Sequence, residues 1–359
     1  MKFIVDILKE AQIMMLIKQL REPITRIAQC MPGLSPQNKT ERFTRHPFWV
    51  MVDKEMMDHI RSWRFMILVA IVVLTCLGAS YTALLNIAKA VKPGDADEAF
   101  LFLNLFTVSD GTLPSFVVFM GFLGPLLGIG MGFDAINSEQ SRGTLSRILS
   151  QPIHRDYLIN AKFVAALMVI ALLVFVMGYL VAGAGLIAIG IPPTFEEFMR
   201  INLFLMLSVV YIAFWLNLSV LFSIRFRQAA TSALSGIAVW LFFNLFYPLM
   251  LNIVLKPFTP SAYASPKSIY LFERSRYLLS QLMPNELFNE ATSTLLMPTV
   301  RSVGPLTMQQ VEGALPGPLP LGQSALLVWP QITGLLAATL ICFALSYYLF
   351  VRREIRGRS

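Results

Sequence analysis

The chain has 359 residues, of which 56% are hydrophobic and only 14% are charged, and its mean hydropathy is +0.64. Soluble domains are about one quarter charged, so this composition excludes a soluble globular protein and indicates a polytopic membrane protein. A net charge of +8 could suggest nucleic-acid binding, but the positive residues are spread over every segment on one side of the apolar runs, as membrane topology alone requires.

Two amphipathic stretches precede the first long apolar run. Charges interrupt every apolar patch in the first 24 residues, so we expect an interfacial helix there and no cleavable signal peptide. The connector MPGLSPQNKT separates it from a second amphipathic stretch at 46–64. The alternative is a small soluble domain, but about 60 residues of this kind would hold a marginal core. In the second stretch we expect these side chains to lie in the headgroup region: Phe48, Trp49, Val52, Met56 and Ile60.

Six uncharged runs are long enough to cross a bilayer, which takes about 20 apolar residues as helix. Because the runs are continuously apolar and not alternating, we expect helices and not barrel strands. They cover residues 65–87, 115–133, 163–191, 201–224, 229–254 and 325–351.

The distribution of Lys and Arg predicts the orientation of the chain. With a cytoplasmic N-terminus, 21 of the 29 fall in the inner segments and 8 in the outer ones. We therefore expect both termini, and the polar segment 134–162, to face the cytoplasm.

Catalytic and metal-binding motifs are not found in the sequence. The chain has no G-x-x-x-x-G-K-[ST] phosphate loop, no G-x-S-x-G and no H-E-x-x-H, and its three Cys and three His show no metal-ligand spacing. The glycines of GFLGPLLGIGMG lie in a span, where they indicate close helix packing. We expect no enzyme activity, no metal and no cofactor in this chain.

The spans carry no ionisable residue, whereas ion-coupled carriers and voltage sensors usually bury one. Energy for uphill transport must then come from a partner. Polar residues that could line a pathway are Asn217, Asn244 and Gln331, although such residues more often hold helices together.

The outer segment 255–324 contains two stretches with helical periodicity, the second beginning at Pro284, followed by an irregular Pro- and Gly-rich half. We expect it to cap the outer mouth or to bind an extracytoplasmic partner. The alternative is a plain linker, but ordered helices in a loop of this length usually cover something. Its methionines make a weak case for copper.

The polar segment between the second and third runs predicts a short amphipathic helix. Thr144 can cap it, Leu145, Ile148 and Leu149 share one face, and the bond to Pro152 ends it. Pattern alone leaves two uses open: a passive connector on the membrane, or a helix that inserts into a groove of a cytoplasmic protein.

The stretch FDAINSEQSRGTLSRILSQPIHRDYLINAKF resembles the cytoplasmic loop of ABC-2 type transporter permeases. The family pattern is a Glu, then Gly-Thr-Leu, a Leu-rich turn, a Pro-containing stretch with a following Arg, and a Lys that opens the next span. This chain has these features at Glu139, 143–145, Pro152, Arg155 and Lys162. The likeness is greatest to the subfamily of the nitrous-oxide-reductase copper-maturation and gliding-motility permeases. It covers most of residues 45–351 and is specific for the family, not for a substrate.

The resemblance implies an all-α, six-span fold of the type V ABC exporter kind, with an amphipathic elbow helix at 46–64. Residues 1–44 would form an N-terminal arm, whose role is open, 45–351 the transmembrane domain with loops 134–162 and 255–324, and 352–359 a basic tail. Segment 142–153 would be the coupling helix that docks on a separate ATPase subunit, and that subunit would bind ATP and magnesium. Two permease copies, as a homodimer, would stand above two ATPases. The implied contacts to the ATPase are Glu139, Arg142, Gly143, Thr144, Leu145, Ile148, Leu149, Gln151, Pro152 and Arg155.

We therefore expect a transmembrane permease subunit of an ATP-binding-cassette transporter in the inner cell membrane, exporting a hydrophobic or amphipathic substrate. The alternative is a mechanotransmission or scaffold subunit that acts on an extracytoplasmic partner without moving a solute. An ion channel or secondary carrier is disfavoured by the uncharged spans.

Overall fold

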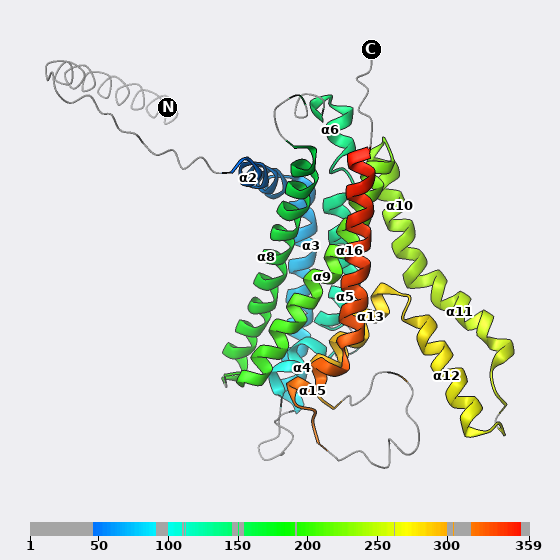
Figure 1. The fold of residues 1–359 in the computed structure, drawn as a ribbon. Coiled ribbons are helices and arrows are strands. Elements are labelled where there is room, and N and C mark those ends of the chain that lie inside the picture. The colour runs from blue at the N-terminus through cyan, green and yellow to red at the C-terminus, as the bar shows by residue number, and fades with distance from the viewer. Residues whose placement is uncertain are drawn as a thin grey trace, which may run out of the picture. The chain divides into compact units, whose positions relative to one another are not determined.

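The computed structural model describes residues 46–90, 100–109, 111, 113–145, 150, 154–190, 192–261, 263–299, 304 and 317–352. All regular elements of these residues are helices (Figure 1). The first half holds α2 (Pro47–Ile60), α3 (Trp63–Ala90), α4 (Leu101–Thr107), α5 (Phe116–Gly132), α6 (Asn137–Ser141), α8 (Arg155–Ile189) and α9 (Phe195–Arg225). The second half holds α10 (Ala229–Leu241), the π-helix η1 (Phe242–Phe246), α11 (Tyr247–Leu255), the 3-10 helix η2 (Lys256–Phe258), α12 (Pro266–Ser280), α13 (Pro284–Leu296), α15 (Leu321–Leu327) and α16 (Trp329–Arg352).

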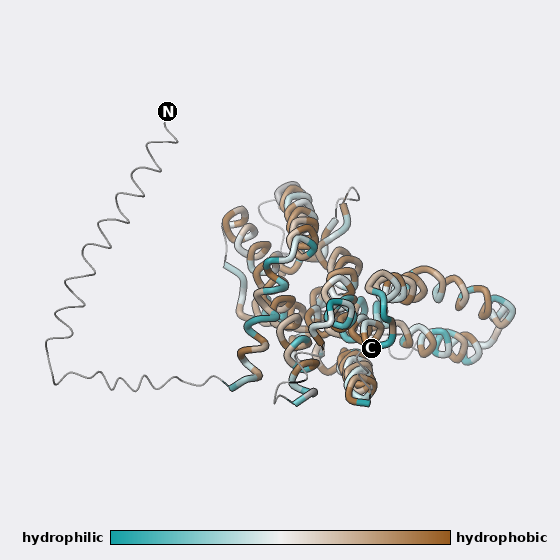
Figure 2. The backbone as a smooth tube through the Cα atoms, turned by 90° about the horizontal axis from the view of Figure 1, so that it is seen from above, coloured by the Kyte–Doolittle hydropathy of each residue, from teal (hydrophilic) through white to brown (hydrophobic). Residues whose placement is uncertain are grey.

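Six of these helical stretches are long and apolar enough to cross a membrane, which confirms the six predicted spans. They are Trp63–Leu85, Phe116–Ser141, Asp156–Ile189, Phe195–Arg225, Ala229–Phe258 and Trp329–Arg352. Figure 2, which looks at the molecule from above, shows hydrophobic residues throughout the helical bundle. The chain is therefore an all-α polytopic membrane protein.

Helix α9 is the central element of the bundle. It packs against α5, α8, α10, α13 and α16, and its side chains Phe204, Tyr211 and Trp215 are fully buried. The contact between α5 and α9 is close because glycines face it. A Cβ at Gly128 would lie 2.7 Å from the carbonyl oxygen of Ile212, and a Cβ at Gly132 would lie 2.8 Å from that of Leu216. The prediction that these glycines serve close helix packing is confirmed.

Helix α2 is separated from the first span by a short break. The hydroxyl of Ser62 accepts a hydrogen bond from the N–H of Phe65, so Ser62 caps α3 and the predicted elbow ends at Ile60. Helix α2 lies against the first turns of α8 (Figure 1). Its Val52 is buried against Ala161 and Ala165 of α8. The prediction that Val52 lies among lipid headgroups is therefore wrong, because a neighbouring helix covers that face.

The other side of α2 does remain uncovered. Trp49 and Ile60, both expected in the headgroup region, are exposed, as are Val50 and Met57. The end of the bundle at which α2 and α6 lie is called the α2 end below, and the end at which α4 and α15 lie is the α4 end (Figure 1).

The fifth span departs from a regular helix in its middle, at η1. After η2 the chain reverses, and α12 runs back beside α11. Both helices lie apart from the central bundle in both views (Figures 1 and 2). Helix α13 then turns into the bundle and contacts α4, α5, α9, α16 and η1. The two helices predicted in 255–324 are confirmed, with Pro284 in the first turn of α13.

Candidate functional site

Three charged side chains from distant parts of the chain meet at the α2 end. The ammonium of Lys162 on α8 lies 2.8 Å from a carboxylate oxygen of Glu55 on α2 and 2.7 Å from one of Glu139 on α6. All three side chains are largely buried, with 7%, 8% and 12% of their surface exposed. A buried pair of this kind is costly to break, because the remaining charge would be left without a partner. We call Glu55, Lys162 and Glu139 the triad.

The local sequence explains why these residues converge. Glu55 lies one helical turn after the buried Val52, on the face of α2 that packs against α8. Lys162 follows Ala161, and the small side chain of Ala161 allows α8 to contact α2 at Val52. Helix α6 is held to α9 by the hydroxyl of Ser223, which accepts the N–H groups of Ile136 at 2.9 Å and of Asn137 at 3.2 Å.

The surrounding charges shift the titration of the groups on α2. Burial alone would raise the pKa of Glu55, but the ammonium groups of Lys162 and Lys54 outweigh it, so its pKa lies below the usual value and the carboxylate is charged. Burial would lower the pKa of Lys54, and Glu55 and Asp58 together raise it instead. Burial lowers the pKa of His59, despite the carboxylates nearby.

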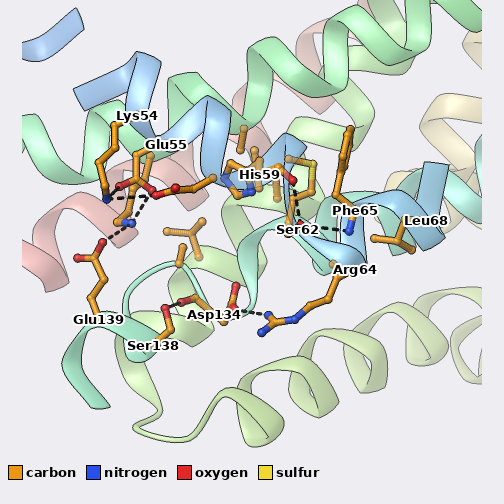
Figure 3. A pocket seen from close by; sticks show the side chains of 18 of the residues that line it. Lys54, Glu55, His59, Ser62, Arg64, Phe65, Leu68, Asp134, Ser138 and Glu139 are labelled. Carbon is orange, nitrogen blue, oxygen red and sulfur yellow. Dashed lines mark hydrogen bonds and ion pairs between the residues drawn. The ribbon is translucent and has the colours of Figure 1, made fainter. Parts of the chain in front are cut away.

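A second ion pair joins the first span to the same region. Arg64, in the first turn of α3, pairs with Asp134 just after α5 (Figure 3). The Arg64 guanidinium also lies over the ring of Phe133, 5.2 Å from its centroid. The segment that follows the second span is thus tied to α3 through Arg64 and to α2 and α8 through the triad.

These residues surround a cavity of about 700 Å³, shown in Figure 3. Its polar wall comprises Lys54, Glu55, Asp58, His59, Ser62, Arg64, Asp134, Ser138, Glu139, Arg142, Thr144 and Lys162. Its apolar wall comprises Trp63, Phe65, Leu68, Gly130, Met131, Ala135, Ala166, Leu216 and Val220. We call this the α2 cavity.

The predicted ATPase contacts are only partly within the described residues. Ile148, Leu149, Gln151 and Pro152 lie outside them, and Arg155 begins α8 but its side chain is also outside. Of the rest, Glu139 is engaged in the triad and Leu145 is buried with 3% exposure.

The remaining predicted contacts lie just before that gap. Arg142 and Gly143 are exposed, and Gly143 has the left-handed φ of 69° that favours glycine. The Thr144 hydroxyl donates to the carbonyl of Glu139 at 3.2 Å. That this segment contacts an ATPase stays a prediction.

Each of the three predicted pathway residues makes contacts between helices. The amide of Asn217 donates to the carbonyl of Thr339 on α16 at 3.4 Å. Asn244, in η1, accepts from the amide of Asn285 on α13 at 3.5 Å. Gln331 donates to Tyr277 at 3.0 Å and to Glu290 at 3.2 Å. These contacts are what residues that hold helices together would make, and a pathway role stays a prediction.

The insertion of α13 was not apparent in the sequence. Phe288 stacks on Tyr211, near the middle of α9, with 4.3 Å between ring centroids. Glu290 accepts hydrogen bonds from Gln281 at 2.6 Å and from Gln331. Burial, together with the charge of Glu290, raises the pKa of Tyr277 to about 12 and raises that of Glu286 above the usual value. Carboxylates of segment 255–324 therefore reach the bundle, although the central parts of the spans have none.

Comparison with known proteins gives a consistent set of relatives. The family described as "ABC-2 family transporter protein" matches residues 49–355. "Probable ABC transporter permease protein NosY" of Pseudomonas aeruginosa is 27% identical over 215 residues, which cover 58% of this chain and 70% of that protein. The protein with the same description from Stutzerimonas stutzeri is 27% identical over 214 residues, with the same coverage of 58% and 70%.

Proposed function

This chain belongs to the ABC-2 family of transporter proteins. We propose that, as a membrane subunit of an ABC transporter, it exports a hydrophobic or amphipathic substrate and that separate ATPase subunits supply the force. In the proposed assembly two copies of the chain form a homodimer above two ATPases. The ATPases bind ATP and magnesium and perform the hydrolysis, and this chain holds no cofactor.

The observation that carries the proposal is the triad. Segment 142–153 directly follows α6, and α6 bears Glu139, which shares Lys162 with Glu55. A push on segment 142–153 would therefore move α6, α2 and α8 as one body. Such rigid-body motion of packed helices is a common way for a small displacement to reach a distant site.

The proposed orientation places the α2 end in the cytoplasm, where an ATPase can reach segment 142–153. It follows from the excess of Lys and Arg in the segments at this end. Both termini are then cytoplasmic, and the chain lies in the inner cell membrane.

The substrate class follows from the apolar character of the bundle. The six spans lack charged residues over their central parts, which suits a lipid-like, peptide or drug-like solute better than a highly charged one. A highly charged solute would need partners for its charges along the path.

A second candidate function is mechanotransmission to an extracytoplasmic partner. It is favoured by α13, which packs between α5, α9 and α16 and continues from α12. Motion of the bundle would then move α12 without any solute crossing.

The test is reconstitution of the full-length chain with its ATPase in vesicles. We expect ATP-driven movement of an amphipathic fluorescent substrate, with Leu149→Asp and Arg155→Glu inserting normally but hydrolysing ATP without transport. Normal transport by both variants would contradict the coupling role. A probe on α12 that reports ATP-dependent motion while no solute crosses would favour mechanotransmission instead.

A further inference from the structure

We propose that the α2 cavity binds a phospholipid of the adjoining leaflet, with the lipid phosphate at Arg142 and part of an acyl chain along the apolar wall. The cavity volume of about 700 Å³ falls in the usual range for small-molecule sites, roughly 300 to 1,000 Å³. Its two walls, one polar and one apolar, match an amphiphile and not a wholly polar solute.

The polar wall carries four cations and four carboxylates, and three of the four cations lie in ion pairs. Lys54 pairs with Glu55 and Asp58, Arg64 pairs with Asp134, and Lys162 lies between Glu55 and Glu139. The Arg142 guanidinium has no carboxylate partner among the described residues, although it lines the cavity. A guanidinium presents a fork of N–H donors that suits a phosphate. Arg142 is therefore the cation of the wall whose N–H donors are open to a lipid phosphate.

The apolar wall lies at the depth of acyl chains. Leu68 comes five residues after Trp63 on α3, and Val220 five residues before Arg225 on α9, so both lie about 8 Å inward from the helix ends at 1.5 Å per residue. Trp63 is 78% exposed beside the mouth, where a Trp is typical of the headgroup level. A side chain of a soluble partner would have to enter the membrane to reach this wall.

Helix α2, which contributes to the cavity wall, also carries an exposed apolar face. Trp49, Val50, Met57 and Ile60 are exposed on it, and an amphipathic helix with such a face rests in the interface with its apolar side toward the acyl chains. The lipid would thus lie between α2, the start of α3 and the end of α5, next to the triad.

The test is lipid binding to the purified, delipidated full-length chain, followed by native mass spectrometry. Phosphatidylglycerol, diacylglycerol with the same chains and inorganic phosphate are titrated separately, so that headgroup, chain and free anion are distinguished. Arg142→Gln removes the open cation, and Ala135→Phe fills the cavity. Arg227→Gln is the matched control, because Arg227 is exposed at the same end but does not line the cavity. The ATPase is left out of the measurement, so that altered docking of the ATPase at Arg142 cannot be mistaken for altered lipid binding.

We expect phosphatidylglycerol to bind and Arg142→Gln to weaken it about tenfold, as for loss of one hydrogen bond to a charged group. Ala135→Phe should abolish binding, and Arg227→Gln should leave it unchanged. Thermal unfolding confirms that each variant is folded. Equal affinity of Arg142→Gln and the control would overturn the proposal. So would binding of inorganic phosphate as tight as that of the lipid, or binding of diacylglycerol equal to that of phosphatidylglycerol.

Discussion

The ammonium of Lys162 lies 2.8 Å from the carboxylate of Glu55, across 107 residues of sequence. The same ammonium contacts Glu139, so one side chain joins the elbow helix, the third span and the helix that precedes segment 142–153. Because the three groups are buried together, the position of each depends on the other two.

Replacing Lys162 by Met should destabilise the protein by about 3 to 5 kcal/mol, because the buried Glu139 loses its cation and Glu55 keeps only Lys54. Chemical unfolding in detergent micelles measures this loss. Lys54→Met is the control, since Lys54 is 58% exposed and an exposed pair contributes about 1 kcal/mol or less.

The triple variant Lys162→Met, Glu55→Gln, Glu139→Gln should recover part of that stability, because no unpaired charge remains. If the single variant at Lys162 is no less stable than the control, the triad does not hold these helices together.

His59 should make stability depend on pH in the mildly acidic range. Burial lowers the folded-state pKa of His59 from 6.5, and the charge of Lys162 lowers it further. The carboxylates of Glu55, Asp58 and Asp134 oppose this shift. The unfolded chain then binds a proton that the folded chain does not, so stability falls as pH drops below about 6.5. His59→Gln should flatten the change in unfolding temperature between about pH 7.5 and 5.5. An equal slope in His59→Gln and in the unaltered protein would contradict this account.

Glycine packing between α5 and α9 gives a sharp steric prediction. An added methyl group at Gly128 or Gly132 meets backbone atoms of α9 closer than 3.0 Å, so Gly128→Ala and Gly132→Ala should each cost roughly 1 to 3 kcal/mol. Gly183→Ala is the control, because a Cβ there has no neighbour within 4 Å. The unfolding temperatures of Gly128→Ala and Gly132→Ala should be lower than that of Gly183→Ala. The steric account fails if all three substitutions have the same effect.

Arg200 should hold the α4 end together. Its fully buried guanidinium donates to the carbonyls of Leu295 at 2.8 Å and Leu319 at 2.5 Å and to the hydroxyl of Ser324 at 3.2 Å. Arg200→Met leaves these buried acceptors without their donor, at about 1 to 3 kcal/mol each. Hydrogen exchange should therefore rise in α13 and α15 but not in α3.

The control for this experiment is Arg225→Met, because Arg225 is exposed at the opposite end of the same helix. Uniform exchange changes across all helices, or none, would show that Arg200 does not anchor α13 and α15.

The local features of this fold could be predicted from the sequence. The six spans follow from uncharged runs of membrane length, and α12 and α13 follow from helical periodicity and from Pro284. Amphipathicity predicted α2, but could not tell whether Val52 faces lipid or another helix, since both are apolar. Pattern identifies an apolar face and not what covers it.

The features that depend on distant contacts could not be predicted. Glu55 and Lys162 are ordinary interfacial residues when each is read in its own helix. In the sequence, Arg200 is only one of the positive charges of the predicted outer segments. In the structure it donates hydrogen bonds to groups 95 to 124 residues away. The insertion of α13 was hidden because its helix is too short and polar to be a span.

The measurement that tests the central claim most directly is photo-cross-linking from position 149 of the full-length chain, in membranes that also contain the ATPase. A photoreactive residue in place of Leu149 should give a covalent adduct with the ATPase, in a yield that changes when ATP is added. The same residue in place of Ile187, which is 88% exposed near the other end of α8, should give none. No adduct at position 149, or an equal yield at both positions, would contradict the account.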